Sequence, residues 1–210
     1  AAMAASDDFD LTIYGKGGHG GWPQDTVDPI VAACQVVNSL QTIVSREIEP
    51  QNAAVISIGS IHGGTVYNVI PDSVHLQGTA RSLKLETREL LPKLIERVAN
   101  GVTAALGASC QLDYHFIYPP TINAPEVNRL IDEAVAPLKC LKVEWSKHSS
   151  MGGDDFAFFA QQVPSCYVKL GSGTSQNRQP LHSSTFTIKE EVIRNGILTL
   201  AATTQHFLQS

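Results

Sequence analysis

Residues 9–30 read FDLTIYGKGGHGGWPQDTVDPI and carry the clearest structural pattern in the chain. The first six residues alternate between apolar and polar side chains, which predicts a half-buried strand over 9–14. A glycine-rich loop follows over 15–21, and Asp28-Pro29 supplies a helix N-cap and a first-turn proline. The predicted helix should bury one stripe of residues: Ile30, Ala33, Val37, Leu40 and Val44.

The same kinds of pattern continue to residue 116. Strands are predicted over 53–58, 74–80 and 110–116, where apolar residues recur between turn signals. A helix is predicted from about 87 to 106, ending at Gly107, with a buried stripe of Leu90, Leu94, Val98, Val102 and Ala105. The resulting order, βαββαβ, is that of a ferredoxin-like α+β domain.

Tyr118-Pro119-Pro120 forms a natural boundary. Beyond it the sequence predicts a helix over 125–138, a short helix over 156–159, a strand over 166–170 and a closing helix. The apolar strand over 166–170 implies a sheet that is covered by helices on both faces, and one strand with three helices is not enough to form such a sheet. We therefore expect domains at 7–117 and 118–210, with the second domain incomplete.

Charge and composition narrow the classes of function. The formal net charge is −5 and the basic residues are dispersed, which argues against a nucleic-acid partner. No apolar run approaches the roughly 20 residues of a membrane-spanning helix, and residues 1–6 do not read as a secretory signal. The four cysteines lie far apart without a Cys-x-x-Cys pair, which favours a reducing, cytoplasmic compartment.

Two loops contain residues that could carry chemistry. Residues 15–20 match the G-x-G-x-x-G fingerprint of dinucleotide-binding proteins, but the predicted helix begins near Pro29 instead of at the loop. His19 in that loop could polarise a carbonyl, or it could be a loop histidine without a role. His182 follows the last predicted strand, where ligands bind in open α/β sheets, but a catalytic zinc needs about three protein ligands. Asp154-Asp155 fits a helix cap better than a metal site.

Five motifs in order give the chain a family resemblance. They are GKGGHGGWPQDTVDPI (15–30), NVIPD (68–72), GTAR (78–81), MGGDDFAFF (151–159) and PLHSSTF (180–186). Together they resemble the metal-dependent amidohydrolases that include hippurate hydrolase, N-acyl-amino-acid deacylases and the plant indole-acetyl-amino-acid hydrolases. The resemblance covers nearly the whole chain. It implies an α/β protein in which 7–117 form a ferredoxin-like lid and dimerisation domain and 118–210 form the last part of an α/β zinc-peptidase-like catalytic domain.

The resemblance also implies roles for single residues. His182 matches the final ligand of a centre that binds two divalent metals, zinc or manganese, and His19 matches a catalytic lid histidine that approaches the reacting carbonyl. Substrate-binding candidates by resemblance are Asn68, Arg81, Met151 and Gly152. In such enzymes a metal-bound water, deprotonated by a glutamate, attacks the amide carbonyl, and lid groups can reach the partner subunit's site.

The family's other metal ligands and its general base match no residues of this chain, because they lie upstream of the lid. We therefore expect a portion of an amidohydrolase that acts on N-acyl amino acids or small peptides and forms a homodimer through its lid. The chain alone is expected to be inactive and not to retain metal. The alternative is a non-catalytic dimerisation or binding module of ferredoxin-like fold. A nicotinamide-dependent oxidoreductase, supported by the G-x-G-x-x-G match alone, ranks last.

Overall fold

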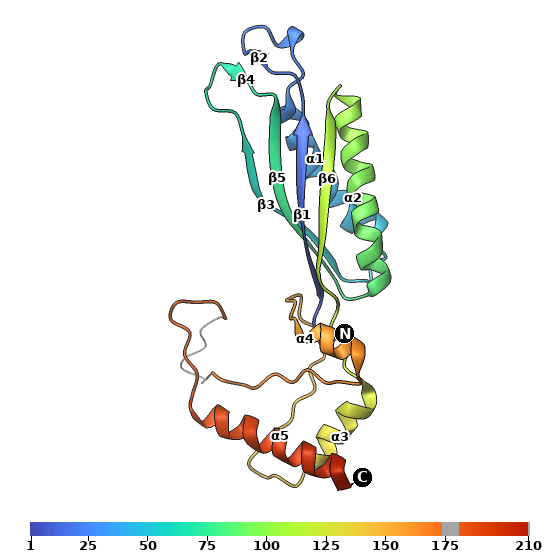
Figure 1. The fold of residues 1–210 in the computed structure, drawn as a ribbon, viewed down its shortest axis with the longest axis vertical. Helices are drawn as coiled ribbons and strands as arrows, with labels where there is room; N and C mark the ends of the chain where they lie inside the picture. The colour runs from blue at the N-terminus through green and yellow to red at the C-terminus, as the bar shows by residue number, and fades with distance from the viewer. Residues whose placement is uncertain (174–180, 210) are drawn as a thin grey trace. The chain divides into compact units, whose positions relative to one another are not determined.

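The computed structural model describes residues 1–173 and 181–209 of the chain, which divides into two compact units. Unit 1 comprises Ala1–Thr121 and Ser149–Phe158, and unit 2 comprises Ile122–His148 and Phe159–Ser210. Unit 1 contains every strand that is assigned in the described residues, whereas unit 2 contains helices and loops (Figure 1). The division into domains at 7–117 and 118–210 remains a prediction.

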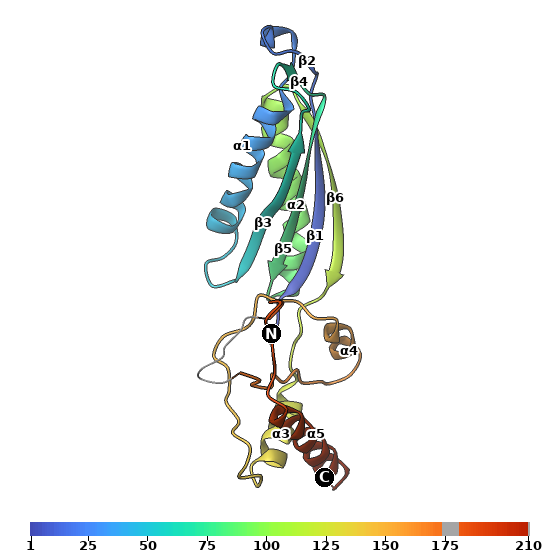
Figure 2. The ribbon, with the colours of Figure 1, turned by 90° about the vertical axis from the view of Figure 1, so that its left-hand side faces the viewer.

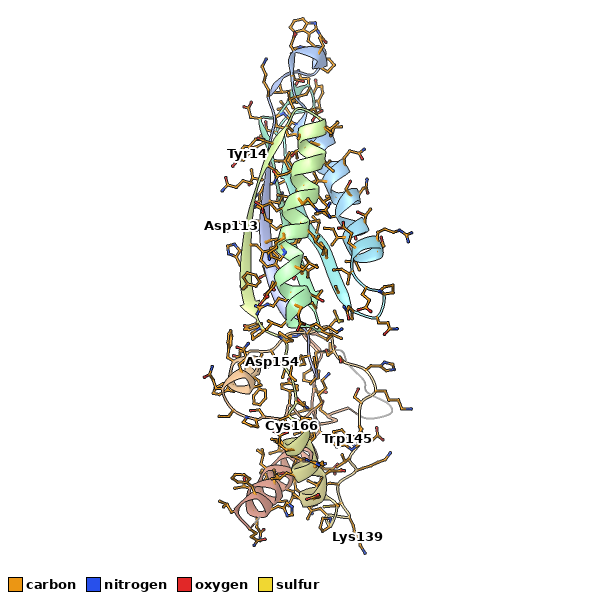
Figure 3. All side chains as sticks on the ribbon, turned by 90° about the vertical axis from the view of Figure 1, so that its right-hand side faces the viewer. Tyr14, Asp113, Lys139, Trp145, Asp154 and Cys166 are labelled. Carbon is orange, nitrogen blue, oxygen red and sulfur yellow. The ribbon has the colours of Figure 1, made fainter. Side chains whose placement is uncertain are left out.

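Unit 1 is built on a four-stranded antiparallel sheet in the order β3-β5-β1-β6. The strands are β1 (Ala5–Tyr14), β3 (Ala54–Gly63), β5 (Ser73–Ser82) and β6 (Ser109–Tyr118). With α1 (Pro29–Thr42) and α2 (Leu85–Ala105) they give the βαββαβ order, so the predicted ferredoxin-like fold is confirmed. Both helices cover one face of the sheet, α1 over β3 and β5 and α2 over β5 and β6, and the other face is open (Figures 2 and 3).

The core of unit 1 lies between the sheet and the two helices. Phe9, Leu11 and Ile13 of β1 are fully buried and alternate with more exposed residues, because successive side chains of a strand point to opposite faces. Leu40 of α1 and Ile95 of α2 belong to the same buried cluster. Each such side chain contributes about 1.5–3 kcal/mol when it is removed from water.

The buried stripes of the two helices agree only in part with the prediction. In α1 Ala33 and Leu40 are buried as predicted, whereas Ile30 is 39% exposed. In α2 Leu91 is buried instead of Leu90, which is 41% exposed. Apolar residues occupy adjacent positions in both helices, so two overlapping stripes fit a period of 3.6 residues. Contact with the sheet decides which of the two stripes is buried.

The end of α2 agrees with the prediction. Gly107 adopts a left-handed conformation with φ of +73°, and the N–H of Ala108 donates to the carbonyl of Thr103 at 2.9 Å. Glycine reaches this conformation without the steric penalty of a Cβ atom, so it ends the helix cleanly. The chain then turns directly into β6.

Unit 2 contains α3 (Pro125–Val135) and α5 (Glu191–Gln209), which pack on each other, and α4 (Phe156–Gln162) crosses the unit boundary in sequence. The strand predicted over 166–170 is not formed, because no described segment of the chain pairs with it. The Tyr167 N–H instead donates to the side chain of Asn123 at 2.9 Å. Across residues 1–173 and 181–209, no helix has the length and apolar character needed to cross a bilayer.

Candidate functional site

The glycine-rich loop forms the tip of unit 1, beyond the end of the main sheet (Figure 1). There β2 (Gly18–His19) pairs antiparallel with β4 (Val69–Ile70), so His19 stands opposite Val69. The N–H of Gly20 donates to the carbonyl of Asn68 at 2.8 Å. The structure therefore brings together His19 and Asn68, the two lid residues identified by resemblance.

The glycines of the tip are explained by a close approach of two backbones. A Cβ atom at Gly20 would lie 3.0 Å from the Asn68 carbonyl oxygen, closer than side-chain atoms normally pack. The 3₁₀ helix η1 (Pro23–Asp25) follows the tip, and α1 begins only at Pro29. The G-x-G-x-x-G segment therefore contributes β2, which pairs with β4, and does not lead directly into a helix that could hold a pyrophosphate.

His19 is exposed and held by its own turn. Its Nδ1 accepts a hydrogen bond from the Gly21 N–H at 2.9 Å, and its ring lies 4.6 Å from the Trp22 ring, centroid to centroid. The Asp72 carboxylate accepts a hydrogen bond from the Gly17 N–H at 2.8 Å, which ties the two arms of the tip together. The tip therefore presents an imidazole with an aromatic neighbour.

Met151 and Gly152 lie at the other end of unit 1. Met3 forms bridges to Thr121 and to Ser150. The N–H of Ala4, just before β1, donates to the carbonyls of Ser150 at 2.9 Å and Gly152 at 3.1 Å. The loop that contains Met151 and Gly152 is thus fastened to the residues that lead into β1.

Arg81 belongs to this same end. It lies on β5 opposite Ser6 of β1, and the backbone of Gly153 packs so closely on Ser6 that an added Cβ would lie 2.4 Å from the Ser6 Cβ. The Nη1 atom of Arg81 is buried and has no hydrogen-bond partner among the described residues.

The tip and the Arg81 end are separated by the length of the sheet. Tyr14 ends β1 beside the tip, whereas Asp154 lies at the opposite end of unit 1 (Figure 3). Ser6 and Tyr14 are eight residues apart, so at about 3.3 Å per residue the separation is about 26 Å. A small substrate in contact with Arg81 is therefore out of reach of His19 in the same unit 1.

His182 lies in unit 2, on an exposed turn. Its φ of 64° makes it the only residue other than glycine with a positive φ in the part of the chain that the structure describes. Side chains with a Cβ adopt this conformation at a cost, and such residues concentrate at functional sites. Residues 1–173 and 181–209 contain no group of three or more metal-ligating side chains that could hold an ion, so they do not fit a complete metal centre.

Asp154 behaves as the sequence suggested. Its Oδ1 accepts a hydrogen bond from the Phe156 N–H at 3.0 Å, at the start of α4. This is the geometry of a helix cap. The carboxylate is therefore accounted for by local structure.

A polar cluster on the open face of the sheet was not predicted. His75 Nε2 lies 3.0 Å and His115 Nε2 lies 3.5 Å from the carboxylate of Asp10, and Gln77 donates to the same carboxylate at 3.1 Å. The hydrogen bond from Gln77, together with the neighbouring His75, holds the pKa of Asp10 below its usual value against the opposing effect of burial. The signal in the sequence is the period-2 alternation, which places these residues on the face opposite the core.

Comparison with known proteins places these observations in a family context. Residues 5–106 match the model of the peptidase dimerisation domain. The chain is 36% identical over 199 residues to thermostable carboxypeptidase 2 of Saccharolobus solfataricus and 32% identical over 194 residues to hippurate hydrolase of Campylobacter jejuni. These alignments cover 93% and 92% of this chain and 50% of each relative, so the chain spans about half the length of these curated relatives.

A solved structure agrees with the sequence comparisons. The crystal structure of a dinuclear metal-binding peptidase of the M20 family from Bacillus subtilis matches with a TM-score of 0.77 and 31% sequence identity. The match covers 96% of this chain and 49% of that chain. The similarity therefore extends through both units.

Proposed function

The chain belongs to the M20 family of amidohydrolases and peptidases, with residues 5–106 as its peptidase dimerisation domain, and from that membership we propose its function. It is the C-terminal part of an enzyme that hydrolyses the amide bond of N-acyl amino acids or small peptides. In this proposal 7–117 form the lid and dimerisation domain, and 118–210 form the last part of the catalytic domain. The activity belongs to the longer parent polypeptide.

The separation of the candidate residues along the sheet indicates that the active site is shared between two subunits. His19 and Asn68 lie on an exposed tip about 26 Å from the end that contains Arg81, at about 3.3 Å of strand per residue. Residues that serve one substrate cannot be so far apart within one protomer. We therefore assign the tip of one subunit to the active site of its partner, with His19 beside the reacting carbonyl and Asn68 near the substrate carboxylate.

The two edges of the sheet indicate where the partner binds. Exposed edge strands are usually protected by charged residues or prolines. Edge strand β6 contains Asp113, whereas edge strand β3, AVISIGSIHG, contains no Lys, Arg, Asp, Glu or Pro. The neighbouring helix α1 also lacks charged residues, and its Val31 is 51% exposed. The side formed by β3 and α1 therefore fits a homodimer interface.

This interface can be tested with a matched pair of substitutions. Val31→Glu places a charge on the proposed interface, and Leu90→Glu places one at a similarly exposed apolar position on α2. We expect Val31→Glu to weaken dimerisation at least about tenfold, equivalent to about 1.4 kcal/mol, and Leu90→Glu to leave it unchanged. Sedimentation equilibrium measures both dissociation constants. Equal effects of the two substitutions would place the dimer contact elsewhere.

The metal centre is proposed to be completed by the rest of the parent. His182 would supply one ligand from this chain, and its positive φ is consistent with a side chain that is held for function. When bound, two divalent metals, zinc or manganese, would lower the pKa of water and polarise the amide carbonyl. Arg81 and the Met151–Gly152 loop, which lie at the same end of unit 1, are proposed to contact the substrate.

Unit 2 supports the view that its domain is incomplete here. Apolar side chains follow one face of α5 and are exposed; they are Ile193, Ile197, Leu200 and Leu208. Several of these residues line an apolar surface groove. Large contiguous apolar surface is normally covered. We propose that the remaining part of the catalytic domain covers this face.

The central experiment compares the 210-residue chain with the parent polypeptide. Both are dialysed against zinc or manganese, analysed for metal and assayed with hippurate. We expect hydrolysis and about two metals per chain only for the parent, as a two-metal site requires. Hydrolysis by the 210-residue chain would show that its site is complete. A parent without activity on hippurate, N-acetyl amino acids or dipeptides would favour the non-catalytic module.

A further inference from the structure

The turn that carries His19 also controls the state of its imidazole. We propose that Gly21 and Trp22 are positioning residues, which hold the neutral His19 ring as the tautomer with its proton on Nε2 and in one orientation. The catalytic part of this inference rests on the proposed function, in which His19 faces the reacting carbonyl. The assignment of the tautomer uses only the contacts within residues 19–22.

The hydrogen bond from Gly21 defines the tautomer. A backbone N–H can only donate, so the Nδ1 atom that it meets at 2.9 Å must offer a lone pair. The proton of the neutral ring is then on Nε2, since the partner of one ring nitrogen sets the state of the other. Within the described residues Nε2 of His19 has no hydrogen-bond partner, so its N–H remains free to donate.

The tautomer determines which chemistry His19 can perform. An Nε2–H group can donate to a carbonyl oxygen and to the oxyanion that develops from it. The same nitrogen cannot accept a proton from water while it carries its own. The geometry therefore assigns His19 to polarisation of the carbonyl, and it excludes a role for the neutral ring as general base through Nε2.

Trp22 restricts the orientation of the ring. The two ring planes meet at 34° with centroids 4.6 Å apart, which is a normal aromatic contact. The backbone N–H of Trp22 also donates to the His19 carbonyl at 2.9 Å, so the tight turn that positions Gly21 also positions the indole ring. A Cβ on Gly21 would lie 3.2 Å from Nδ1 and from Cε1 of His19, so a side chain there would crowd the imidazole. The ring is thus held by the backbone on one side and by an aromatic face on another.

The tautomer can be measured directly on the 210-residue chain. Long-range proton–nitrogen NMR of ¹⁵N-histidine-labelled protein, at a pH where the rings are neutral, separates the two ring nitrogens, and His19→Gln assigns the signals. We expect His19 to be almost entirely Nε2–H. His148, whose ring has no hydrogen-bond partner in residues 1–173 and 181–209, should show a mixture of both tautomers. A mixture at His19 equal to that of His148, or a dominant Nδ1–H form, overturns the proposal.

The positioning role of Trp22 is tested by kinetics of the parent polypeptide with hippurate. His19→Ala should lower kcat about 10²–10³-fold, as for loss of one oxyanion donor. Trp22→Ala should lower kcat about tenfold through misplacement of the ring, with little change in KM. Trp22→Phe should keep most of the wild-type kcat, because a phenyl ring can also stack on the imidazole. Trp145→Ala removes the chain's other tryptophan, also exposed, and should change nothing.

A double substitution separates positioning from other roles. If Trp22 acts through His19, then Trp22→Ala should cause no further loss in a His19→Ala background. An undiminished tenfold loss there, or an effect confined to KM, would mean that Trp22 contacts substrate or supports the fold instead. If the parent hydrolyses none of the probes, the proposed function fails, and the NMR measurement still decides the tautomer.

Discussion

Replacement of Arg88 by methionine should strongly destabilise unit 1. The Arg88 guanidinium donates to both carboxylate oxygens of Asp7, at 2.9 Å from Nε and 2.7 Å from Nη2. The Ile117 N–H donates to the same carboxylate at 3.0 Å, and Asp7 is only 1% exposed. Methionine keeps the aliphatic stem but leaves a buried carboxylate without its cation. Removal of one partner from such a buried pair costs about 3–5 kcal/mol.

A second arginine provides the control. Arg97 pairs with Glu47 on the surface, with 59% of its side chain exposed, so Arg97→Met should cost less than about 1 kcal/mol. Urea unfolding followed by far-UV circular dichroism measures both variants. With a slope of about 2 kcal/mol per molar urea, Arg88→Met should lower the midpoint by about 2 M. Midpoints that agree within about 0.5 M would refute this reasoning, because that shift is what a surface pair alone produces.

Three further predictions test other parts of unit 1. Gly78→Ala would place a Cβ 2.2 Å from Cζ of the buried Phe9 ring, so it should lower the free energy of unfolding by about 1–3 kcal/mol in the same urea experiment. An unchanged midpoint would show that the Phe9 ring moves aside without cost. Asp28→Ala removes the helix cap whose carboxylate accepts a hydrogen bond from the Ile30 N–H at 2.9 Å. Amide hydrogen exchange in the first turn of α1 should show that the free energy of local opening falls by about 1 kcal/mol. Unchanged protection of these amides would contradict the role of Asp28 as a cap. Burial raises the pKa of the Cys110 thiol, so its thiolate forms only at higher pH. Iodoacetamide should therefore label Cys110 more slowly than the exposed Cys34 near pH 8, and the difference in rate should shrink as the pH rises. Equal labelling rates near pH 8 would count against the effect of burial.

Much of the fold of unit 1 could be predicted because its signals are local. Alternation along 9–14, the Asp28-Pro29 start and the Gly107 stop each depend on a few neighbouring residues, and each agrees with the structure. The buried faces of α1 and α2 could be predicted only in part, because tertiary packing decides which of two overlapping apolar stripes contacts the sheet, and Leu40 is buried as predicted whereas Ile30 is not. The strand predicted over 166–170 failed for a related reason: a strand needs a partner, and the described chain offers none.

The candidate site was less accessible to sequence reasoning. The pairing of β2 with β4, which brings His19 to Asn68, joins two-residue strands that leave no periodic signal. The Asp7–Arg88 pair joins residues 81 positions apart, and neither residue type suggests burial. The hydrogen bond from Gly21 to His19 is local, but it depends on a turn geometry that glycine permits and does not impose. The assignments of Arg81, Met151, Gly152 and His182 remain proposals.

If the tip of one subunit completes the active site of its partner, two variants that are inactive alone should restore activity when they are co-expressed. In the parent polypeptide, His19→Ala damages the tip and His182→Ala damages the metal centre. If the site is shared, a mixed dimer contains one site with both residues intact, so random assortment into two-fold dimers should restore roughly a quarter of the wild-type hydrolysis of hippurate. Activity no higher than that of the separate variants would rule out a shared site, because it would place His19 and His182 in the site of one protomer.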